Sequence, residues 1–419
     1  MDGSTWRDDL LASTQRAGRL PSVVGGVVDA RRRLTWSGAV GEWAAESGGW
    51  PTDPTDVQYR IGSISKTLTA VLLLQARDAG LLDLARPLSA YVAGVPYPDR
   101  SVRHTMGHVA GLPAEPAGPW WEWHGRGDRA ALLAAEEERA PAAVAGQEFR
   151  YSNLGYGLLG AVAEEVLGDS WWELVRRRVL APLGMARTSY VPEGPHAQGW
   201  SVAHLDGGLV AEPHSDTGAM APAGQLWSTL DDLATYAGFV LAGDGDVLAR
   251  STLEEASVEV LPGTGYGLGF RVDAGLVGHT GTMPGFMATA FADRAAGRAY
   301  VGLANGTTGH PSVPLAHRML SADPVDVVPA GTGWCPPPPP PPDVAGLLGS
   351  WRWGERPFEL RWDRGPQGEP ELQLVELRPV SAFEEYTQRD GRWIGTDGTE
   401  LELGDHELIT QTYRFRRPG

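Results

Sequence analysis

Apolar and polar residues follow two different periods along the chain, and the changes between them divide the sequence into regions. Residues 22–30 and 34–43 are rich in valine and aromatic residues around a short basic turn, which predicts a β-hairpin. The run 68–74 is almost wholly apolar, and a helix stop signal follows at Ala79-Gly80. Together they predict a buried central helix. From about residue 80 to 240 the pattern is that of helices and loops, and strand patterns return after residue 265.

The remaining elements before residue 323 follow from the same periodicity. Helices are expected at 5–18, 129–138, 154–167, 171–179, 229–242 and 314–321, and strands at 266–273, 276–280, 288–292 and 299–304. Strands from both ends of this region, with helices inserted between them, predict an α+β architecture. It consists of one mixed antiparallel sheet flanked by helices, beside a helical subdomain.

An unbroken run of seven prolines, residues 336–342, marks a change of pattern. As a polyproline II helix at ~3.1 Å per residue it would form a stiff spacer of roughly 22 Å. A docking ligand for another protein is the alternative, and a linker is the favoured interpretation. Beyond it, segments of period two recur at 349–353, 358–362, 371–377, 383–387, 392–395, 401–403 and 409–415. The sequence thus predicts one domain at 1–323, a Pro-rich linker at 324–342 and a small all-β, barrel-like domain at 343–419.

Composition excludes several classes of function. The net charge of −17 argues against nucleic acid or an anionic membrane as a partner. Cys335 is the only cysteine, so internal disulfides and cysteine-based metal clusters are excluded, and the ten histidines lack metal-ligand spacing. We therefore expect no metal and no cofactor. The N-terminus lacks the charge and apolar pattern of a signal peptide, and no apolar run approaches the ~18 residues of a membrane span. The chain as written is expected in the cytoplasm.

One side chain stands out against this composition. Lys66 is the only lysine among 35 basic residues, and all the others are arginine. Arginine stays protonated in proteins, whereas a buried lysine can lose its proton and act as a base. Ser63 lies three residues earlier, so the two side chains share one face of the predicted helix. The positive end of the helix dipole would favour a serine alkoxide and disfavour an ammonium group.

Two further motifs lie beside predicted elements. Tyr151-Ser152-Asn153 precedes the apolar helix 154–167, and asparagine occurs only twice in the chain. A helix N-cap is the simpler interpretation of this motif. The segment Gly278-His279-Thr280-Gly281-Thr282 ends a predicted strand, and taken alone it is an ordinary junction between a strand and a turn.

In the order Ser-x-x-Lys, Tyr-x-Asn, His-Thr-Gly, the three motifs resemble those of the serine β-lactamase and penicillin-binding-protein superfamily. They resemble most the branch related to class C β-lactamases, which contains esterases, D-amino-acid-specific peptidases, carboxypeptidases and peptide cyclases. The resemblance covers roughly residues 5–322, and it implies a β-lactamase/transpeptidase-like fold. The tail resembles the lipocalin-like β-domain of some relatives. Other stretches typical of the family are 59–62, 79–84, 108–113, 183–185 and 222–224.

The resemblance implies a role for each motif residue. Ser63 would be the nucleophile that forms an acyl-enzyme, and either Lys66 or Tyr151 would be its base. Asn153 would orient Lys66 and the substrate amide. The catalytic set is completed by His279 and by Thr282, whose backbone N–H would form the oxyanion hole with that of Ser63, and Thr280 and Gly281 would contact substrate.

Two features bear on specificity. His279 stands where a lysine is more common, so a permanent charge that would hold the carboxylate of a β-lactam or peptide is absent. An ester or peptide substrate is therefore favoured over true β-lactamase activity. Between the first two motifs, Trp121 and Trp123 could wall an apolar acyl pocket, and packing within the helical subdomain is the alternative.

The sequence thus predicts a serine hydrolase of the esterase or D-amino-acid peptidase type. Its partner would be a small-molecule or short-peptide substrate, with no obligate protein partner. A peptide acyltransferase or cyclase, as in thioesterases of the penicillin-binding-protein type, would use the same residues and stays an alternative. A non-catalytic sensor of β-lactams or peptides, acylated without turnover, is a second alternative.

Overall fold

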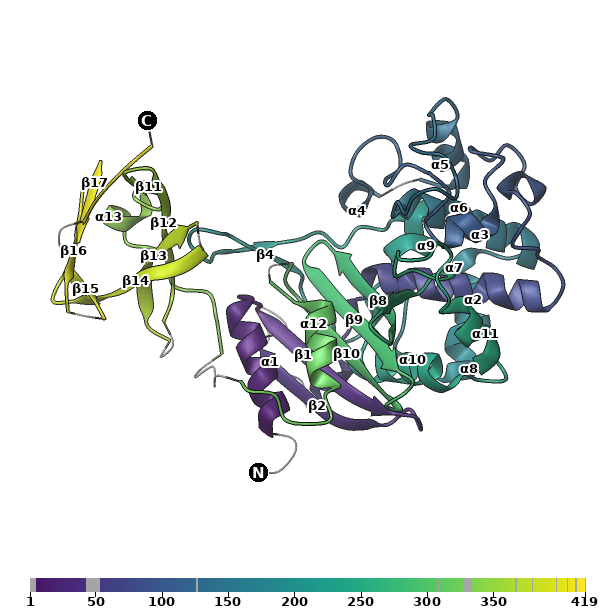
Figure 1. Ribbon diagram of the computed structural model, residues 1–419, viewed down its shortest axis with the longest axis horizontal. Coiled ribbons are helices and arrows are strands. Elements are labelled where there is room, and N and C mark those ends of the chain that lie inside the picture. The colour runs from purple at the N-terminus through teal and green to yellow at the C-terminus, as the bar shows by residue number, and fades with distance from the viewer. Residues whose placement is uncertain are drawn as a thin grey trace.

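The fold was analysed in a computed structural model. It describes residues 5–42, 53–125, 127–307, 309–327, 333–365, 368–378, 380–396, 398–404, 406–410 and 413–418. These segments form a six-stranded sheet with helices on both faces, a helical subdomain and a closed barrel (Figure 1). The predicted α+β architecture with a barrel-like domain after it is confirmed.

The central sheet joins strands from the two ends of residues 1–323. Its strand order is β2-β1-β10-β9-β8-β7, and all neighbours run antiparallel. Val24 of β1 pairs with Leu303 of β10, 279 residues further along the chain. The strands are β1 (Ser22–Asp29), β2 (Leu34–Gly41), β7 (Arg271–Asp273), β8 (Leu276–Met283), β9 (Phe286–Asp293) and β10 (Arg298–Ala304).

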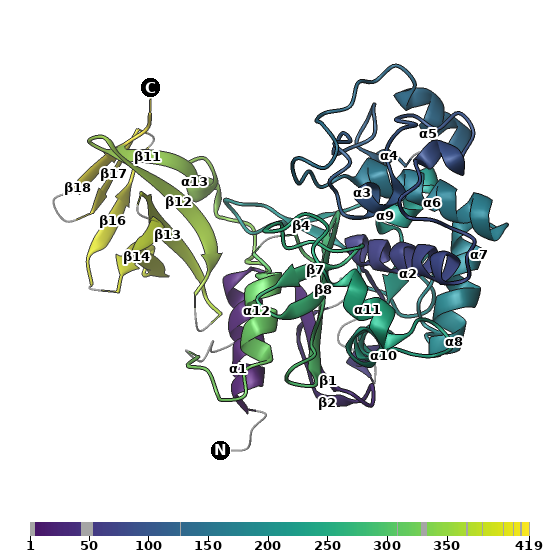
Figure 2. The same cartoon turned by 45° about the vertical axis from the view of Figure 1, so that its right-hand side comes forward.

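Helices cover the sheet on both faces (Figure 2). On one face lie α1 (Thr5–Ala17) and α12 (Ser312–Met319), which bury Leu10, Leu11 and Leu315 in a small core. On the other face α10 (Leu230–Ala242) packs against β1, β9 and β10. Beyond it lies α2 (Ser65–Asp78), whose residues from Ser65 to Leu74 are all buried. The larger core lies on this second face of the sheet. Packing within it positions the start of α2 beside β8.

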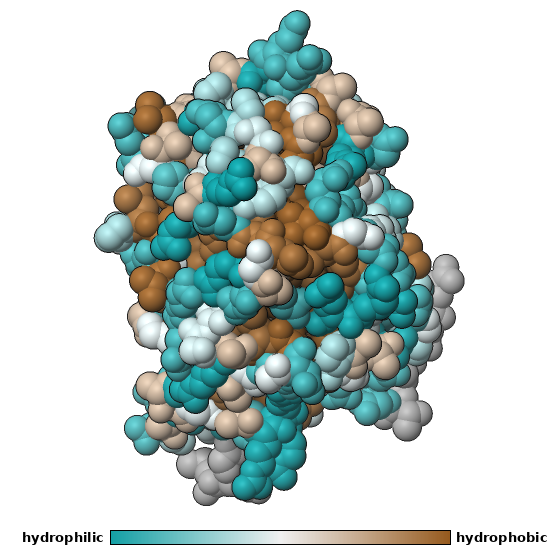
Figure 3. All heavy atoms as spheres, turned by 90° about the vertical axis from the view of Figure 1, so that its right-hand side faces the viewer, coloured by the Kyte–Doolittle hydropathy of each residue, from teal (hydrophilic) through white to brown (hydrophobic). Residues whose placement is uncertain are grey.

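The helical subdomain lies between β3 (Tyr59–Arg60) and β7 in the sequence. Apolar side chains gather near the middle of the face on the right-hand side of Figure 1, where this subdomain lies (Figure 3). Its helices are α3 (Val102–Met106), α4 (Trp121–His124), α5 (Arg129–Glu136), α6 (Asn153–Leu167), α7 (Trp171–Val175), α8 (Ala181–Leu183), α9 (Ala221–Gly224) and α11 (Arg250–Ala256).

Some predicted elements differ from the structure. The strand expected at 266–273 is confined to β7, because Gly269 adopts a left-handed φ of +88° and turns the chain before it. The helix expected at 171–179 ends at Val175 and continues as one π-helical turn, Arg176–Leu180. The hairpin of β4 (Trp200–Val202) and β5 (Leu209–Ala211) was not predicted. Residue 43, the expected end of the first hairpin, lies outside the described residues.

The C-terminal strands close into a barrel of eight, and its order follows the sequence. Its separate core includes Trp351, Leu360, Tyr386 and Phe415. The single strand expected at 409–415 is instead the hairpin β17–β18, in which Thr410 pairs with Tyr413 across the two strands. The strands are β11 (Gly349–Trp353), β12 (Arg356–Arg364), β13 (Pro370–Leu377), β14 (Val380–Arg389), β15 (Arg392–Gly395), β16 (Glu400–Leu403), β17 (Glu407–Thr410) and β18 (Tyr413–Arg416).

The proline run lies against the barrel. The carbonyl of Pro336 accepts a hydrogen bond from Arg364 Nε at 3.0 Å, and that of Pro338 accepts one from Trp362 Nε1 at 2.7 Å. The Trp362 N–H donates to the carbonyl of Leu205, between β4 and β5, at 2.8 Å. The prolines therefore run beside β12 and are held to this strand by hydrogen bonds, just before α13 (Pro342–Ala345).

None of the helices in the described part of the chain combines the length and apolar character needed to cross a lipid bilayer.

Candidate active site

The turn that carries Ser63 is pressed against β8. Gly62 has a φ of +49°, and a Cβ there would lie 2.6 Å from the backbone nitrogen of Thr282. A Cβ on Gly281 would lie 1.9 Å from the carbonyl oxygen of Ile61. Only glycine fits at either position, because any side chain would force the two backbones apart. This close approach places Ser63 and Thr282 on the wall of the same cavity.

Lys66 lies one helical turn after Ser63 and is completely buried. Its Nζ is 2.8 Å from Ser63 Oγ and 2.6 Å from the carbonyl oxygen of Ala223 in α9. Burial lowers the pKa of Lys66 to about 7, and the carboxylates of Glu115 and Glu122 act in the opposite direction. A large share of the amine is therefore neutral near pH 7, within reach of the serine proton.

Tyr151 reaches the same serine from the start of α6. Its hydroxyl is hydrogen-bonded to Ser63, and its ring centroid lies 4.2 Å from that of His108 and 5.1 Å from Lys66 Nζ. Burial raises the pKa of Tyr151 well above its usual value, and the hydrogen bond to Ser63 only partly offsets this. The phenol is therefore protonated near neutral pH and can donate a hydrogen bond.

The N-cap of α6 is Ser152, whose Oγ accepts a hydrogen bond from the Gly155 N–H at 2.9 Å. Asn153 is the first helical residue and lines the cavity. Its Nδ2 donates to Glu115 Oε1 at 2.7 Å, and its buried Oδ1 has no hydrogen-bond partner among the described residues. Asn153 therefore makes no hydrogen bond to Lys66 among the described residues, and Lys66 is hydrogen-bonded to Ser63 and Ala223 instead.

His279 is buried and carries no charge at neutral pH. Its Nε2 is 2.9 Å from the hydroxyl of Tyr266, and its Nδ1 is bonded to the carbonyl of Thr280. Burial lowers the pKa of His279 to about 3. A positive charge nevertheless lines the cavity, because Arg271 of β7 pairs in register with Gly278, beside the motif. No ion pair of Arg271 is found within the described segments. The cavity wall therefore includes a cation from the neighbouring strand, although His279 itself is uncharged.

The tryptophan segment contributes differently from expectation. Trp121 belongs to the core, and its Nε1 donates to Glu115 Oε2 at 2.7 Å. Trp123 is 42% exposed and stacks on Trp120 with ring centroids 5.8 Å apart. Neither Trp121 nor Trp123 lines the cavity, whereas Glu122 between them does. Burial, followed by the charge of Glu115, raises the pKa of Glu122 to about 7.

Together these residues wall a cavity of about 540 Å³. Within it lie Ser63, Glu122, Phe149, Tyr151, Asn153, Thr264, Gly265, Tyr266, Arg271, Val272, Asp273, His279, Thr280 and Thr282. Four charged residues of the site were not predicted from the sequence: Glu122, Arg271 and Asp273 in the wall, and Glu115, which binds Asn153. The only signal was a charge within a segment adjoining a motif, and charged residues are common in such segments. No group of three or more histidine, cysteine or acidic side chains in the described part of the chain could hold a metal ion.

The chain is similar to known protein families, curated proteins and solved structures. The profile of the Beta-lactamase family matches residues 7–322, and that of a domain of unknown function (DUF7586) matches residues 340–403. Beta-lactamase-like protein 2 of Dictyostelium discoideum is 25% identical over 263 residues, which are 59% of this chain and 47% of that protein. The chain spans about half the length of the curated relatives it matches.

Two solved structures are similar over different extents. The octameric penicillin-binding protein homologue from Pyrococcus abyssi has a TM-score of 0.69 at 22% identity, with 100% of both chains covered. A D-stereospecific amidohydrolase from Streptomyces sp. has a TM-score of 0.58 at 26% identity, with 71% of this chain and 95% of that one covered. The first likeness is one of fold and includes the barrel. With three quarters of its length matched by the family profile, this chain belongs to the Beta-lactamase family.

Proposed function

We propose that the protein is a serine hydrolase that cleaves an ester or amide bond through an acyl-enzyme on Ser63. The observation that carries this proposal is the buried Lys66, whose Nζ lies 2.8 Å from Ser63 Oγ and whose pKa is lowered to about 7. A serine hydroxyl needs a base within hydrogen-bond reach, and a neutral amine there meets that need.

The reaction follows from the order of hydrogen bonds. Lys66 takes the proton of Ser63 as Oγ attacks the substrate carbonyl carbon. The oxyanion that forms accepts hydrogen bonds from the backbone N–H groups of Ser63 and Thr282. The protonated Tyr151, hydrogen-bonded to Ser63, passes a proton to the leaving amine or alcohol and is reprotonated from Lys66. Water then attacks the acyl-enzyme with Lys66 again as base, which releases the acid and restores Ser63.

The charges of the cleft suggest the class of substrate. The wall of the cavity carries two acidic side chains, Glu122 and Asp273, and one arginine, Arg271. Asp273 is hydrogen-bonded to His317 at 2.9 Å, which leaves Glu122 as the acidic wall group without a histidine or arginine bonded to it in the described residues. A short peptide or amino-acid amide with a free amino group would complement Glu122, and a carboxylate on the other part of the substrate would complement Arg271. The similarity to the Streptomyces D-stereospecific amidohydrolase supports a D-residue on the acyl side.

A panel of chromogenic substrates tests the proposal. It includes the p-nitroanilides of D-alanine, L-alanine and N-acetyl-D-alanine, with p-nitrophenyl acetate and nitrocefin. We expect D-alanine p-nitroanilide to be cleaved, with kcat/KM at least tenfold above that of its N-acetyl form, and no turnover by Ser63→Ala. No hydrolysis of any ester or amide would refute the proposal. Products that carry an added amine in place of water would assign the acyl-transferase alternative.

Glu122→Gln tests the substrate class separately from the chemistry. The amide keeps a hydrogen-bond acceptor for Trp120 but loses the charge. We expect a tenfold or greater rise in KM for D-alanine p-nitroanilide, with kcat/KM for uncharged p-nitrophenyl acetate changed less than threefold. Glu137→Gln, at an exposed carboxylate on the end of α5, is the matched control. Equal effects of Glu122→Gln on both substrates would rule out recognition of the amine by Glu122.

A further inference from the structure

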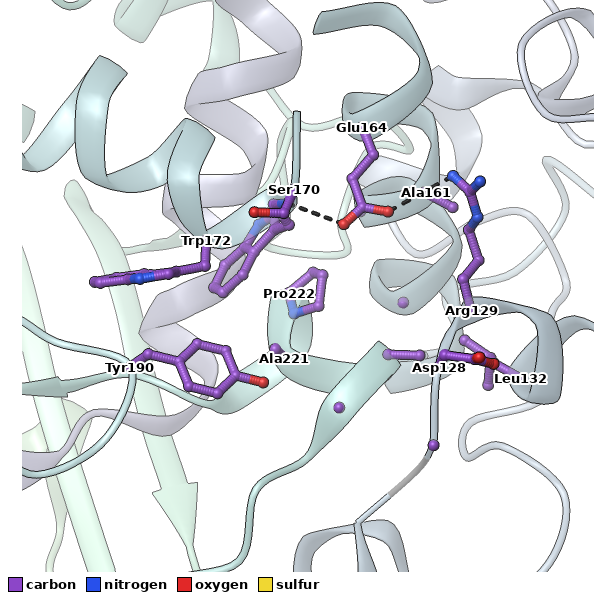
Figure 4. Close-up of a pocket in the computed structure, with 16 residues that line it drawn as sticks. Asp128, Arg129, Leu132, Ala161, Glu164, Ser170, Trp172, Tyr190, Ala221 and Pro222 are labelled. Carbon is purple, nitrogen blue, oxygen red and sulfur yellow. Dashed lines mark hydrogen bonds and ion pairs between the residues drawn. The ribbon is translucent and has the colours of Figure 1, made fainter. Parts of the chain in front are cut away.

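A second cavity of about 570 Å³ lies behind α9. It is bounded by the starts of α5 and α7, one face of α6, Tyr190, and four residues at or just before α9, Gly218, Ala219, Ala221 and Pro222 (Figure 4). None of the residues that line it lines the cavity of Ser63. Neighbouring residues of α9 belong to the two different cavities. Ala221 and Pro222 line the second cavity, whereas the carbonyl of Ala223 binds Lys66.

The walls of this cavity are aromatic and apolar on one side. Trp172 and Tyr190 are half-buried, and their ring centroids are 5.9 Å apart at an interplanar angle of 59°. Pro222 lies between them and the acidic side, as Figure 4 shows, and Leu132 and Ala161 add apolar surface on that acidic side. Half-buried aromatic faces of this kind can pack against a planar ring.

The opposite side carries an excess of negative charge. Asp128 and Glu164 both line the cavity with Arg129. Arg129 is shared between Glu164, at 3.6 Å, and Glu165, at 2.8 Å. The wall thus holds two carboxylates, of Asp128 and Glu164, and one arginine, which is also paired with Glu165 outside the wall. Asp128 uses Oδ1 to cap α5 through the Ala131 N–H, at 3.0 Å, which leaves its charge uncompensated by a cation in the described residues.

We propose that this cavity is a second binding site, for a small aromatic compound that carries one ammonium group. The ring would pack against Trp172 and Tyr190, and the ammonium group would be held by Asp128 and Glu164. An ammonium group near aromatic faces gains a further attraction to their π-systems. A negatively charged ligand of the same shape would meet the carboxylates and is excluded.

The position of the site couples it to the lysine of the catalytic cleft. Thr69 of α2 donates to the carbonyl of Pro222 at 3.0 Å and accepts from Trp171 Nε1 at 2.9 Å. Both Pro222 and Trp171 line the second cavity. A ligand that displaces Pro222 displaces the adjoining carbonyl of Ala223, which holds Lys66. If the ligand displaces Pro222 in this way, occupancy of the second cavity changes the surroundings of Lys66.

Calorimetric titration of the full-length protein with 2-phenylethylammonium tests the site, with 3-phenylpropionate as the anionic counterpart. We expect saturable binding of the cation only. Asp128→Ser keeps an N-cap residue but removes the charge, and it should weaken binding at least tenfold. Trp172→Leu keeps apolar bulk and should weaken binding severalfold. Asp246→Ser, at an exposed acidic residue elsewhere, is the control and should have no effect.

The catalytic cleft is the competing location, because Glu122 lies there. Binding that survives Glu122→Gln but is weakened by Asp128→Ser supports the second site. The reverse pattern, equal binding of 3-phenylpropionate, or no saturation at millimolar concentration would overturn the proposal. The coupling rests on the proposed function. It predicts that adding 2-phenylethylammonium shifts the pH midpoint of p-nitrophenyl acetate hydrolysis. If no ester is hydrolysed, the proposed function fails while the calorimetry still decides the second site.

Discussion

The burial of Lys66 has a direct consequence for stability that does not depend on any substrate. The unfolded chain holds this lysine at the ordinary pKa of 10.5, whereas burial lowers it to about 7 in the folded protein. Between these two pH values the unfolded state binds one more proton than the folded state. Stability therefore rises with pH across this window, and at pH 7 or below the full cost of the buried group is present.

The magnitude follows from the two pKa values. One pKa unit corresponds to about 1.4 kcal/mol, so the lowered pKa of Lys66 costs on the order of 5 kcal/mol at low pH. Lys66→Met removes the titrating group and keeps much of the volume. The free energy of unfolding of the wild-type protein, minus that of Lys66→Met, should therefore increase by roughly 2 kcal/mol between pH 7 and pH 9.

Urea denaturation of the two proteins at pH 6, 7, 8 and 9 measures this difference. Contributions from titrating groups that do not interact with Lys66 cancel in the subtraction, and the hydrogen bond that Met cannot make to Ala223 adds only a constant. Glu122 does interact with Lys66, so both proteins are compared in the Glu122→Gln background, which removes its titration from the window. A difference that stays constant from pH 7 to pH 9 would show that Lys66 keeps its proton in the folded state. It would then be a fixed charge and could not act as the base.

Three further predictions concern catalysis and the domains. Lys66→Arg should leave the fold intact and lower kcat/KM about a thousandfold or more, because arginine cannot give up its proton; near-normal turnover in a p-nitrophenyl acetate assay would contradict this. Arg271→Met should raise KM about tenfold for substrates with a carboxylate and leave p-nitrophenyl acetate unaffected; equal effects on both would exclude a role in binding the carboxylate. A chain cut after Asp323 should fold and retain labelling of Ser63, because the barrel has a separate core; insoluble or unlabelled protein would show that the two units depend on each other.

Strong periodicity made most of the fold predictable. The buried helix after Ser63 and the period-two strands of the barrel are set by local patterns, and they appear within a few residues of their expected bounds. The shortened strand before Arg271 and the β4–β5 hairpin were missed, because the turn at Gly269 and the contact of Leu205 with the barrel depend on tertiary neighbours.

The site was predictable to the extent that its chemistry lies in short motifs. Ser63, Lys66 and Tyr151 converge in the structure. Burial favours the neutral form of each group, so it lowers the pKa of Lys66 and raises that of Tyr151, which supports Lys66 as the proposed base. Glu122 and Arg271 come from segments distant in sequence, so only the folded arrangement brings their charges to one cavity.

The proposed mechanism requires that Ser63 becomes acylated. Labelling with a fluorophosphonate probe, followed by peptide mass mapping, identifies the acylated residue. Two other serines lie close in sequence to the motifs, but the hydroxyl of Ser65 is bonded to the Leu226 N–H and that of Ser152 donates to the Pro113 carbonyl, and both are buried. We expect one adduct, on Ser63, that is absent from Ser63→Ala and strongly reduced in Lys66→Arg. An adduct on Ser65 or Ser152, or labelling that persists in Ser63→Ala, would contradict it.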